Sequence, residues 1–553
     1  MKRWKRFLAL TMALCLSAAL LAGCGGGNDK NQQPGNQQPS SSGTDNNNAP
    51  AAPTNVSEED KYGGTLTIAL ASVASNIDPI MYTGVYEGQI IENICDTLIV
   101  YDNEQMDFWP SLATEWTANE AGDEWTITLR DDVYFQPGKY QDGRKMTAED
   151  VKFSLERSHN ESALARLTML DHCEVIDDTH IVCVLESPNS SFLAALTNSG
   201  NVIVPREEVE GWGEEFGAHL VGTGPFMMAE DGWKTDQGVY MTRFDNYWGQ
   251  KPYLDGLNIV YITEVNQRVN ALKTGEIDIA FDISGEGVQQ IRDDPNLNMV
   301  QNPGMGVNYI YFNMVNGPTA DIRVRKALQM AVDREAMCKA LYQYDEGQPG
   351  WLALPPNSWG YDESLIDLVP KYDVEGAKAL LAEAGYPDGF TLEYYTGDSA
   401  TSKKIGEIFQ QFAQAIGVTV KINQAAWGTF SEIGASGNAD VIAMSWTWYP
   451  DPYFYLNKMF HEESLGTLGN GQQFNIPEVN DLLDQAVAES DQDARAVLYK
   501  EALKLITEQY AQIDYAVANV NVGMSNKVMD FPVRPDKTIE VADDKNNNTW
   551  IAK

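Results

Sequence analysis

Side chains that could catalyse a reaction are plentiful in this 553-residue sequence, but their spacing matches no catalytic or metal-binding signature. The sequence has no G-x-S-x-G nucleophile elbow, no P-loop, no H-E-x-x-H or C-x-x-C pair and no EF-hand loop. None of its five histidines has another histidine three or four residues away, as a helical metal site would require. We therefore predict no catalytic residues, no metal and no cofactor. A carboxylate pair that hydrolyses a glycoside stays open as an alternative, which would make the chain a tethered secreted hydrolase.

A cluster of aromatic residues could instead bind a solute. Asp440 to Ser445 predicts a buried strand, and Trp446, Thr447, Trp448 and Tyr449 follow it directly. Open α/β sheets place ligands at the carboxyl ends of parallel strands, and Trp and Tyr offer a large flat surface with a hydrogen-bonding tip. We therefore predict that these four residues form one wall of a ligand site. The alternative is that the aromatic rings pack in the core at the end of the strand.

Two of the six cysteines are spaced as a disulfide pair would be. Cys173 and Cys183 lie on either side of Asp177–Thr179, a predicted turn between two apolar runs. A hairpin would set them opposite each other, and disulfides are common in exported proteins. We predict a Cys173–Cys183 disulfide, and free thiols are the alternative.

The N-terminus predicts export. A positively charged start is followed by an apolar run, Phe7 to Ala22, which is shorter than the about 20 residues of a membrane-spanning helix. Leu21-Ala22-Gly23-Cys24 resembles the bacterial lipobox, which implies cleavage before Cys24 and a lipid on its sulfur. We predict a lipoprotein signal peptide at residues 1–23 and a protein held outside the cytoplasm on the cell membrane by this lipid. The alternative is an ordinary signal peptide with an incidental cysteine.

The composition divides the rest of the chain into a polar segment and a folded part. Residues 24–60 are mostly Gly, Asn, Gln, Pro, Ser and Asp, which predicts a disordered tether. The remaining chain is long enough to divide into two or three lobes. The formal net charge of −40 argues against nucleic acid and anionic lipid surfaces as partners, and its even spread predicts a solvated acidic surface.

Strand and helix signals alternate along the folded part. Thr65 to Leu70 predicts a strand, and Val479 to Tyr510 predicts one long helical region. The clearest unit is a strand at Phe390–Thr396, a helix at Ser402–Ile416 and a strand at Val418–Ile422. Such a βαβ unit requires parallel strands joined by a right-handed crossover. The fold class is therefore α/β.

Six short sequence blocks carry a family resemblance. They resemble family 5 of the bacterial extracellular solute-binding proteins, the group of dipeptide-, oligopeptide- and nickel-binding proteins of ABC importers. The most specific match is to the pattern L-R-x-x-V-x-F…D-G…T-A-x-D-V. Together the blocks extend over nearly all of the chain after Tyr62; they are Pro110–Trp116, Leu129–Val151, Gly222–Phe226, Gly275–Asp278, Asp321–Ala327 and Trp446–Pro452.

The resemblance implies a three-lobed periplasmic-binding-protein architecture, type II-like and of cluster C, with the ligand cleft between two α/β lobes. Lobe I would comprise residues 61–95, 221–308 and 524–553, lobe II residues 96–220, and lobe III residues 309–523. Lobes I and III would close on the ligand by hinge motion, and an ABC permease with its ATPase subunits would receive the ligand. We expect a monomer that captures di- or oligopeptides. The alternative within this fold is an oligosaccharide or another non-peptide solute.

The resemblance also implies which residues face the ligand. The segment after Trp446 would line the cleft, and its backbone could pair with an extended ligand as an added strand. Asn313 is expected at the lobe junction, and Trp427 is expected in a loop beside the cleft. Peptide-binding members usually carry an Asp three residues after the Trp, where it neutralises the ligand's α-amino group; this sequence has Tyr449 there. Either Asp451 takes over this role, or the ligand lacks a free amine.

Overall fold

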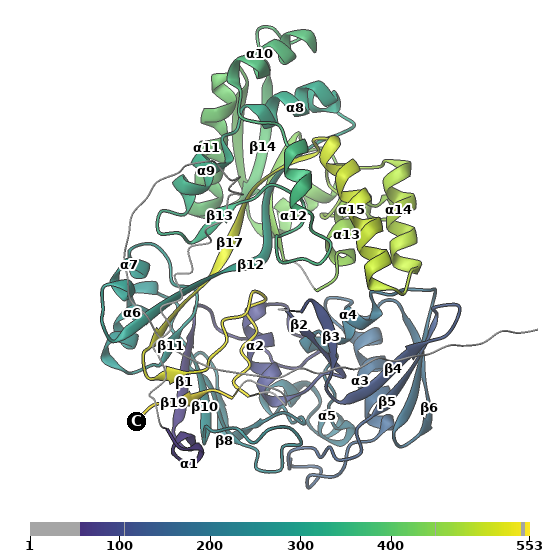
Figure 1. Cartoon of the computed structure of the whole chain (residues 1–553), viewed down its shortest axis with the longest axis vertical. Helices are drawn as coiled ribbons and strands as arrows, with labels where there is room; N and C mark the ends of the chain where they lie inside the picture. The colour runs from purple at the N-terminus through teal and green to yellow at the C-terminus, as the bar shows by residue number, and fades with distance from the viewer. Residues whose placement is uncertain (1–55, 104, 448–449, 543–547) are drawn as a thin grey trace, which may run out of the picture. The chain divides into compact units, whose positions relative to one another are not determined.

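The computed structural model describes residues 56–103, 105–447, 450–542 and 548–553, and Figure 1 shows how their helices and strands are arranged. The predicted signal peptide, the lipid attachment site Cys24 and the aromatic residues Trp448 and Tyr449 lie outside the described residues. Thr447 is described as part of a strand, but its side chain is not.

One large mixed sheet dominates the described residues. Its strand order is β15-β14-β16-β12-β17-β11-β1-β10-β9-β8, with β13 paired to β17. Strand β1 is parallel to β10 and β11, and β14 is parallel to β15 and β16. The strands are β1 (Thr65–Leu70), β8 (Phe226–Lys234), β9 (Gly238–Arg243), β10 (Gly256–Tyr261), β11 (Ile279–Ala280), β12 (Leu297–Phe312), β13 (Gly347–Pro349), β14 (Thr391–Gly397), β15 (Thr419–Ala425), β16 (Val441–Thr447) and β17 (Gln512–Ser525).

Two long antiparallel strands join the two parallel portions of this sheet. Strand β12 has 16 residues and β17 has 14, and they pair along most of their length. Figure 1 shows both strands running from the side of β11 towards the side of β14. A register shift between Pro303 and Val307 interrupts their pairing. The predicted lobe boundaries after residues 308 and 523 fall inside these two strands.

A separate antiparallel sheet lies within residues 113–185. Its order is β4-β5-β7-β6, from β4 (Ala113–Ala118), β5 (Glu124–Leu129), β6 (Leu170–Asp177) and β7 (His180–Leu185). Helix α3 packs on β6, and the apolar side chains of this sheet and helix form a core of their own. Two small two-stranded sheets complete the described strands: β2 (Ile99–Asp102) with β3 (Asp107–Pro110), and β18 (Val528–Met529) with β19 (Trp550–Ile551), each pair antiparallel.

The helices cover the faces and ends of these sheets. They are α1 (Glu58–Lys61), α2 (Val85–Ile94), α3 (Ala148–Glu161), α4 (Phe192–Leu196), α5 (Arg206–Trp212), α6 (Val265–Thr274), α7 (Glu286–Arg292), α8 (Ile322–Met330), α9 (Arg334–Leu341), α10 (Val374–Glu383), α11 (Ala400–Ala415), α12 (Trp427–Ala435), α13 (Tyr453–Phe460), α14 (Pro477–Ala488) and α15 (Gln492–Glu508).

Several predicted elements are confirmed, and two are wrong. The strand at Thr65–Leu70 has the predicted bounds, and β14, α11 and β15 form the predicted parallel βαβ unit. The single helical region predicted from Val479 to Tyr510 is in fact two helices, because Asp491 caps a new helix by accepting a hydrogen bond from the backbone N–H of Ala494 at 2.9 Å. The predicted tether is too long by several residues, since α1 already begins at Glu58.

The glycines of the G-T-G-P block allow a close approach between two backbone segments. A Cβ at Gly222 would lie 2.5 Å from the carbonyl oxygen of Ile94 and 2.7 Å from the Cα of Cys95. The N–H of Gly224 donates to the same Ile94 carbonyl at 2.9 Å, and the N–H of Gln136 donates to the Gly222 carbonyl at 2.9 Å. Only a residue without a side chain fits such a contact, so this block serves the fold.

Candidate functional site

The parallel strands β14, β15 and β16 bring the predicted aromatic residues to one edge of the large sheet. Because β14 is parallel to both neighbours, the carboxyl ends of all three strands meet at that edge. The expected loop position of Trp427 is wrong: this residue is the first of α12, just after β15. Trp446 lies near the end of β16. The edge therefore collects side chains from segments that are far apart in the sequence.

Strand β16 has one side of its backbone open near its end. It pairs with β12 along its whole length, from Val441 to Thr447. Its pairing with β14 covers only Val441 and Ile442. Among the described residues, no further strand pairs with the stretch from Met444 to Thr447 on the β14 side. This stretch can therefore accept one more strand through backbone hydrogen bonds.

Trp446 is half-buried, and its ring packs against the core beneath the sheet. Its indole N–H donates to the carbonyl of Phe454 at 3.2 Å, and its ring packs against the core that contains Tyr309 and Tyr455. The packing of Trp446 agrees with the core interpretation, and its ligand-wall role stays a prediction.

Trp427 is far more open than Trp446. Its side chain is 65% exposed, although its ring lies 5.8 Å from that of the buried Phe430. A large exposed aromatic ring at the carboxyl edge of a parallel sheet is a candidate contact for a solute.

Asp451 lies in the interior and is paired with an arginine. Its carboxylate is fully buried, 2.8 Å from a guanidinium nitrogen of Arg495, which is itself buried, and it also accepts the backbone N–H of Tyr453 at 2.9 Å. Burial raises the pKa of Asp451, and the charge of Arg495 opposes this shift. A second bond from Arg495, to the carbonyl of Ala486 at 2.9 Å, holds the guanidinium in place. In this structure the carboxylate is therefore committed to Arg495.

Asn313 is likewise fully used within the protein. Its side-chain N–H groups donate to the carbonyls of Gly437 at 2.7 Å and Ala439 at 3.1 Å. Its side-chain oxygen accepts the backbone N–H groups of Val315 at 3.0 Å and Asn316 at 2.8 Å. The side chain is buried and holds the turn that follows β12.

The structure places Cys173 and Cys183 opposite each other on β6 and β7, as the hairpin prediction requires. The connecting loop has two residues, Asp178 and Thr179, because Asp177 and His180 already pair. The two sulfur atoms lie 3.6 Å apart, and both residues are free thiols.

Sequence reasoning missed three residues: Asp398, Gln424 and Arg495. Asp398 directly follows β14 and is exposed, and Gln424 braces its turn by donating to the carbonyls of Gly397 and Ser399, each at 3.2 Å. The strand predicted at Phe390–Thr396 could have identified Asp398, because it marks the carboxyl end. No local signal links Arg495 to Asp451, since the two are far apart in the sequence.

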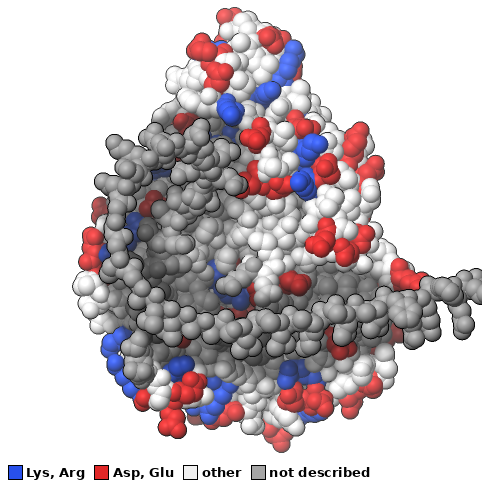
Figure 2. All heavy atoms as spheres, viewed as in Figure 1, with Lys and Arg blue, Asp and Glu red and all other residues white. Residues whose placement is uncertain are grey.

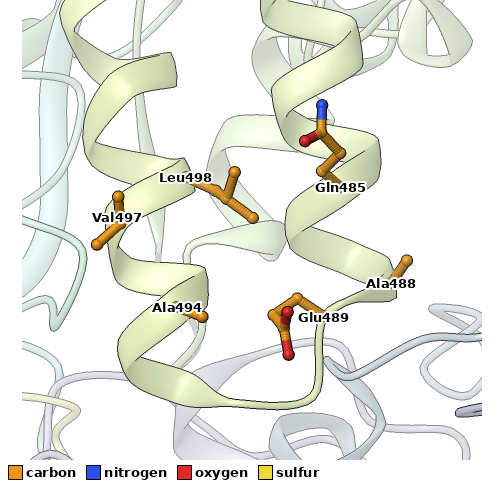
Figure 3. Close-up of a pocket in the computed structure, with 6 residues that line it drawn as sticks. All are labelled: Gln485, Ala488, Glu489, Ala494, Val497 and Leu498. Atoms are coloured by element: carbon orange, nitrogen blue, oxygen red, sulfur yellow. The ribbon is translucent and has the colours of Figure 1, made fainter.

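One pocket among the described residues lies away from this edge. It is a shallow groove of about 640 Å³ between α14 and α15, shown in Figure 3 and lined by Gln485, Ala488, Glu489, Ala494, Val497 and Leu498. None of these residues belongs to the predicted ligand wall, so we assign this groove no ligand.

Charge is spread over the surface. Figure 2 shows Asp and Glu side chains over many parts of the face that it draws, with Lys and Arg between them. Within the described chain, no group of three or more His, Cys, Asp or Glu side chains is placed to hold a metal ion. No helix in that part of the chain is both long enough and apolar enough to cross a bilayer.

Comparisons with known proteins agree with the sequence blocks. Residues 107–466 match the model of the middle part of the bacterial extracellular solute-binding proteins, family 5. The dipeptide-binding protein of Escherichia coli K12 is 27% identical over 453 residues, which cover 77% of this chain and 84% of the relative.

Solved structures agree as well. The DppA periplasmic binding protein of Helicobacter pylori, in complex with the peptide STSA, is 26% identical with a TM-score of 0.74 and covers 90% of this chain and 99% of its own. AgaA of Agrobacterium tumefaciens R10, in complex with agropinic acid, is 26% identical with a TM-score of 0.71 and covers 89% and 99% respectively. These matches confirm the predicted type II-like periplasmic-binding-protein fold. The chain belongs to family 5 of the bacterial extracellular solute-binding proteins, the solute-binding components of ABC importers.

Proposed function

We propose that this protein captures peptides outside the cytoplasm and delivers them to an ABC permease. The observation that carries the proposal is the open backbone edge of β16 from Met444 to Thr447, next to the half-buried ring of Trp446. A peptide has one N–H and one C=O per residue, so an extended peptide can pair with such an edge whatever its side chains are. The peptide ligands of related proteins support this assignment.

In this proposal Trp446, Thr447, Trp448 and Tyr449 form the ligand wall, and Trp427 adds a second aromatic surface. Aromatic rings would cover the apolar parts of the peptide side chains. Asn313 and Asp451 would position this wall rather than contact the ligand, because their polar atoms already have protein partners.

The peptide's amino terminus would find no unpaired buried carboxylate among Asp451 and Asp398. Asp451 is committed to Arg495, and Asp398 is exposed, where water screens its charge. A free α-amine gains little where the buried carboxylate of Asp451 is already paired and the carboxylate of Asp398 is exposed. We therefore favour the alternative in which the ligand does not depend on a free amine, and peptides with a blocked amino terminus fall within its range.

Closure would use the strands that join the two parallel portions of the sheet. We propose that lobe I (residues 61–95, 221–308 and 524–553) and lobe III (residues 309–523) rotate about β12 and β17 near the register shift after Pro303. The monomer, with lobe II at residues 96–220, would present the closed shape to the permease and its ATPase subunits.

We further propose that a lipid on Cys24 holds the mature protein at the cell membrane. The lipobox-like sequence before Cys24 supports this, and the tether between Cys24 and α1 would let the folded part stand away from the membrane. Replacing Cys24 with Ser is expected to move the protein from the membrane fraction to the soluble fraction. If the variant stays in the membrane fraction, another segment anchors it.

Calorimetric titration with a library of di- to pentapeptides tests the proposed ligand class. At least one member is expected to bind, and Trp446→Ala is expected to weaken its binding by about tenfold or more, because aromatic anchors contribute roughly 1–3 kcal/mol. Trp116→Ala is the matched control, since Trp116 is half-buried in β4, away from this edge. An N-acetylated copy of the best peptide is expected to bind within about tenfold of the free peptide.

Three results would redirect the proposal. Loss of binding on acetylation would mean that a carboxylate does pair with the amine. If no peptide gives binding heat but an opine or an oligosaccharide does, the second candidate, a non-peptide solute, is favoured. The agropinic acid complex of AgaA is the observation that supports this candidate. If mass spectrometry showed that the protein steadily consumes a peptide or a glycoside, the protein would be a hydrolase instead.

A further inference from the structure

The hairpin of β6 and β7 places two thiols next to each other in the interior. Cys173 and Cys183 pair in the register of the two strands, and both side chains are buried. Their sulfur atoms lie 3.6 Å apart. A disulfide has a sulfur–sulfur distance of about 2.05 Å, and side-chain rotation is the movement that can bring the two sulfurs together.

Backbone hydrogen bonds identify the kind of strand pair. The N–H of Cys173 donates to a carboxylate oxygen of Glu156 at 3.0 Å, and its C=O accepts from the amine of Lys152. Both partners belong to α3, so these two backbone groups point away from β7. Cys173 and Cys183 are therefore a non-hydrogen-bonded pair, in which the Cα atoms lie about 4.5 Å apart and the side chains are closest. That separation lies within the range that a disulfide spans.

We propose that Cys173 and Cys183 form a structural disulfide once the chain has left the cytoplasm. The inference rests on the proposed function only in requiring export to an oxidising compartment. The oxidant is itself a disulfide, either that of a protein thiol oxidase or glutathione disulfide.

The reaction is a thiol–disulfide exchange in two steps. The thiolate of one cysteine attacks the oxidant's disulfide, forms a mixed disulfide with one of its sulfurs and releases the other as a thiolate. The second cysteine's thiolate then attacks the protein sulfur of the mixed disulfide and releases the remaining oxidant thiolate. The pair loses two protons and two electrons, and the oxidant leaves fully reduced.

The surroundings of the pair determine when the bond forms. A hydrogen bond with the Cys173 thiol, and then burial, raise the pKa of the Cys183 thiol well above its ordinary value. Only the thiolate reacts, so the folded hairpin exchanges slowly. The bond therefore forms while the hairpin assembles, and burial then protects it from reductants. Because β6 is the outermost strand of its sheet, the bond fastens an edge strand to its neighbour.

Two other cysteines serve as internal controls. Cys95 and Cys338 are buried as free thiols in two different cores, and neither core contains a second cysteine that could pair with them. The full chain is unfolded and reduced, then refolded in a mixture of oxidised and reduced glutathione. A thiol-specific maleimide is added under denaturing conditions, and the digested protein is analysed by mass spectrometry.

We expect the peptides of Cys173 and Cys183 to be joined, with a mass about 2 Da below their sum because two hydrogens are lost. Cys95 and Cys338 should carry the label. In the variant Cys183→Ala, Cys173 should be labelled in every sample. Full labelling of both Cys173 and Cys183 in the wild type, even in excess oxidised glutathione, would overturn the proposal. Peptide titration of the same sample reports the proposed function separately.

Discussion

At the scale of single residues, we expect that breaking the buried pair of Asp451 and Arg495 costs more stability than breaking an exposed ion pair. Removing one partner leaves the other charge buried without compensation, which costs about 3–5 kcal/mol. We therefore expect Asp451→Asn and Arg495→Met each to lower the free energy of unfolding by that amount, as measured by urea titration.

The double variant Asp451→Leu with Arg495→Met separates this cause from a loss of packing. It is expected to recover part of the loss, because no unpaired charge remains. Lys421→Met is the matched control. It breaks the exposed ion pair between Lys421 Nζ and Glu393 Oε1, which lie 3.0 Å apart, and should lower the free energy of unfolding by less than about 1 kcal/mol. If the single buried variants behaved like this control, the pair would be as well solvated as a surface pair.

Asp514 gives the stability a dependence on pH. Burial raises the pKa of Asp514 to about 7, and the bond from the side chain of Gln512 opposes this. Arg334 lies near it and donates to its backbone carbonyl at 3.1 Å. An unfolded chain releases this proton near the ordinary Asp pKa of about 4, so between about pH 4 and 7 only the folded state holds the proton. The contribution of Asp514 to the free energy of unfolding therefore decreases as the pH rises from about 4 to 7.

Asp514→Asn should remove this contribution. We expect the wild type to gain stability relative to the variant when the pH is lowered from 7 to 5, by at most about 1.4 kcal/mol per pH unit. Urea titrations of both proteins at the two pH values measure the difference. Equal changes in the two proteins would mean that Asp514 is already ionised in the folded state at pH 5.

At the scale of elements, the break between α14 and α15 depends on its cap. The side chain of Asp491 accepts a hydrogen bond from the backbone N–H of Ala494, so Asp491 is the N-cap at which α15 begins. Asp491→Ala should lower the free energy of unfolding by about 1 kcal/mol, as for other N-caps. Asp493→Asn, in the first turn of the same helix, is the control and should cost only a few tenths of a kcal/mol. Equal effects of the two variants would show that charge near the helix end matters here and the cap does not.

Local signals predicted elements better than they predicted the site. The unit of β14, α11 and β15 was predictable because glycines and polar caps mark its ends and its strands contain β-branched and aromatic residues. The opposition of Cys173 and Cys183 was predictable because a turn lies between them. The helical break at Asp491 was missed because apolar residues continue on both sides of it.

The site depends on contacts that no local pattern records. The open edge of β16 follows from the strand order, in which β14 leaves β16 after Ile442. No local pattern shows that the carboxylate of Asp451 lies against Arg495, more than forty residues away in the sequence. Asn313 was a candidate because of its expected position, whereas its four hydrogen bonds assign it to a turn.

At the scale of the whole molecule, closure should depend on the strand segment around Gly304. A Cβ there would lie 2.7 Å from the carbonyl oxygen of Ala518 in β17, so Gly304→Ala must push the two strands apart. We expect this variant to show a smaller decrease in radius of gyration on peptide binding than the wild type, measured by small-angle X-ray scattering. Gly428→Ala adds a methyl group where no atom lies within 4 Å and should leave the scattering change intact. An unchanged response of Gly304→Ala would place the bending elsewhere.

Two segments that are more than a hundred residues apart in the sequence, at Ile94 and Gly224, lie side by side. Ile94 ends α2, and its carbonyl accepts the N–H of Gly224, more than a hundred residues later; close by, the N–H of Ile203 donates to the carbonyl of Asp96 at 3.1 Å. Within the intervening stretch, residues 113–185 contribute a separate sheet with its own core, whereas Val202, Val204, Phe216 and Leu220 pack in the core of the large sheet. The two ends of the stretch adjoin, so we expect that grafting the corresponding stretch from a homologue would preserve the strand order of the large sheet, provided that the residues packed against that sheet are kept.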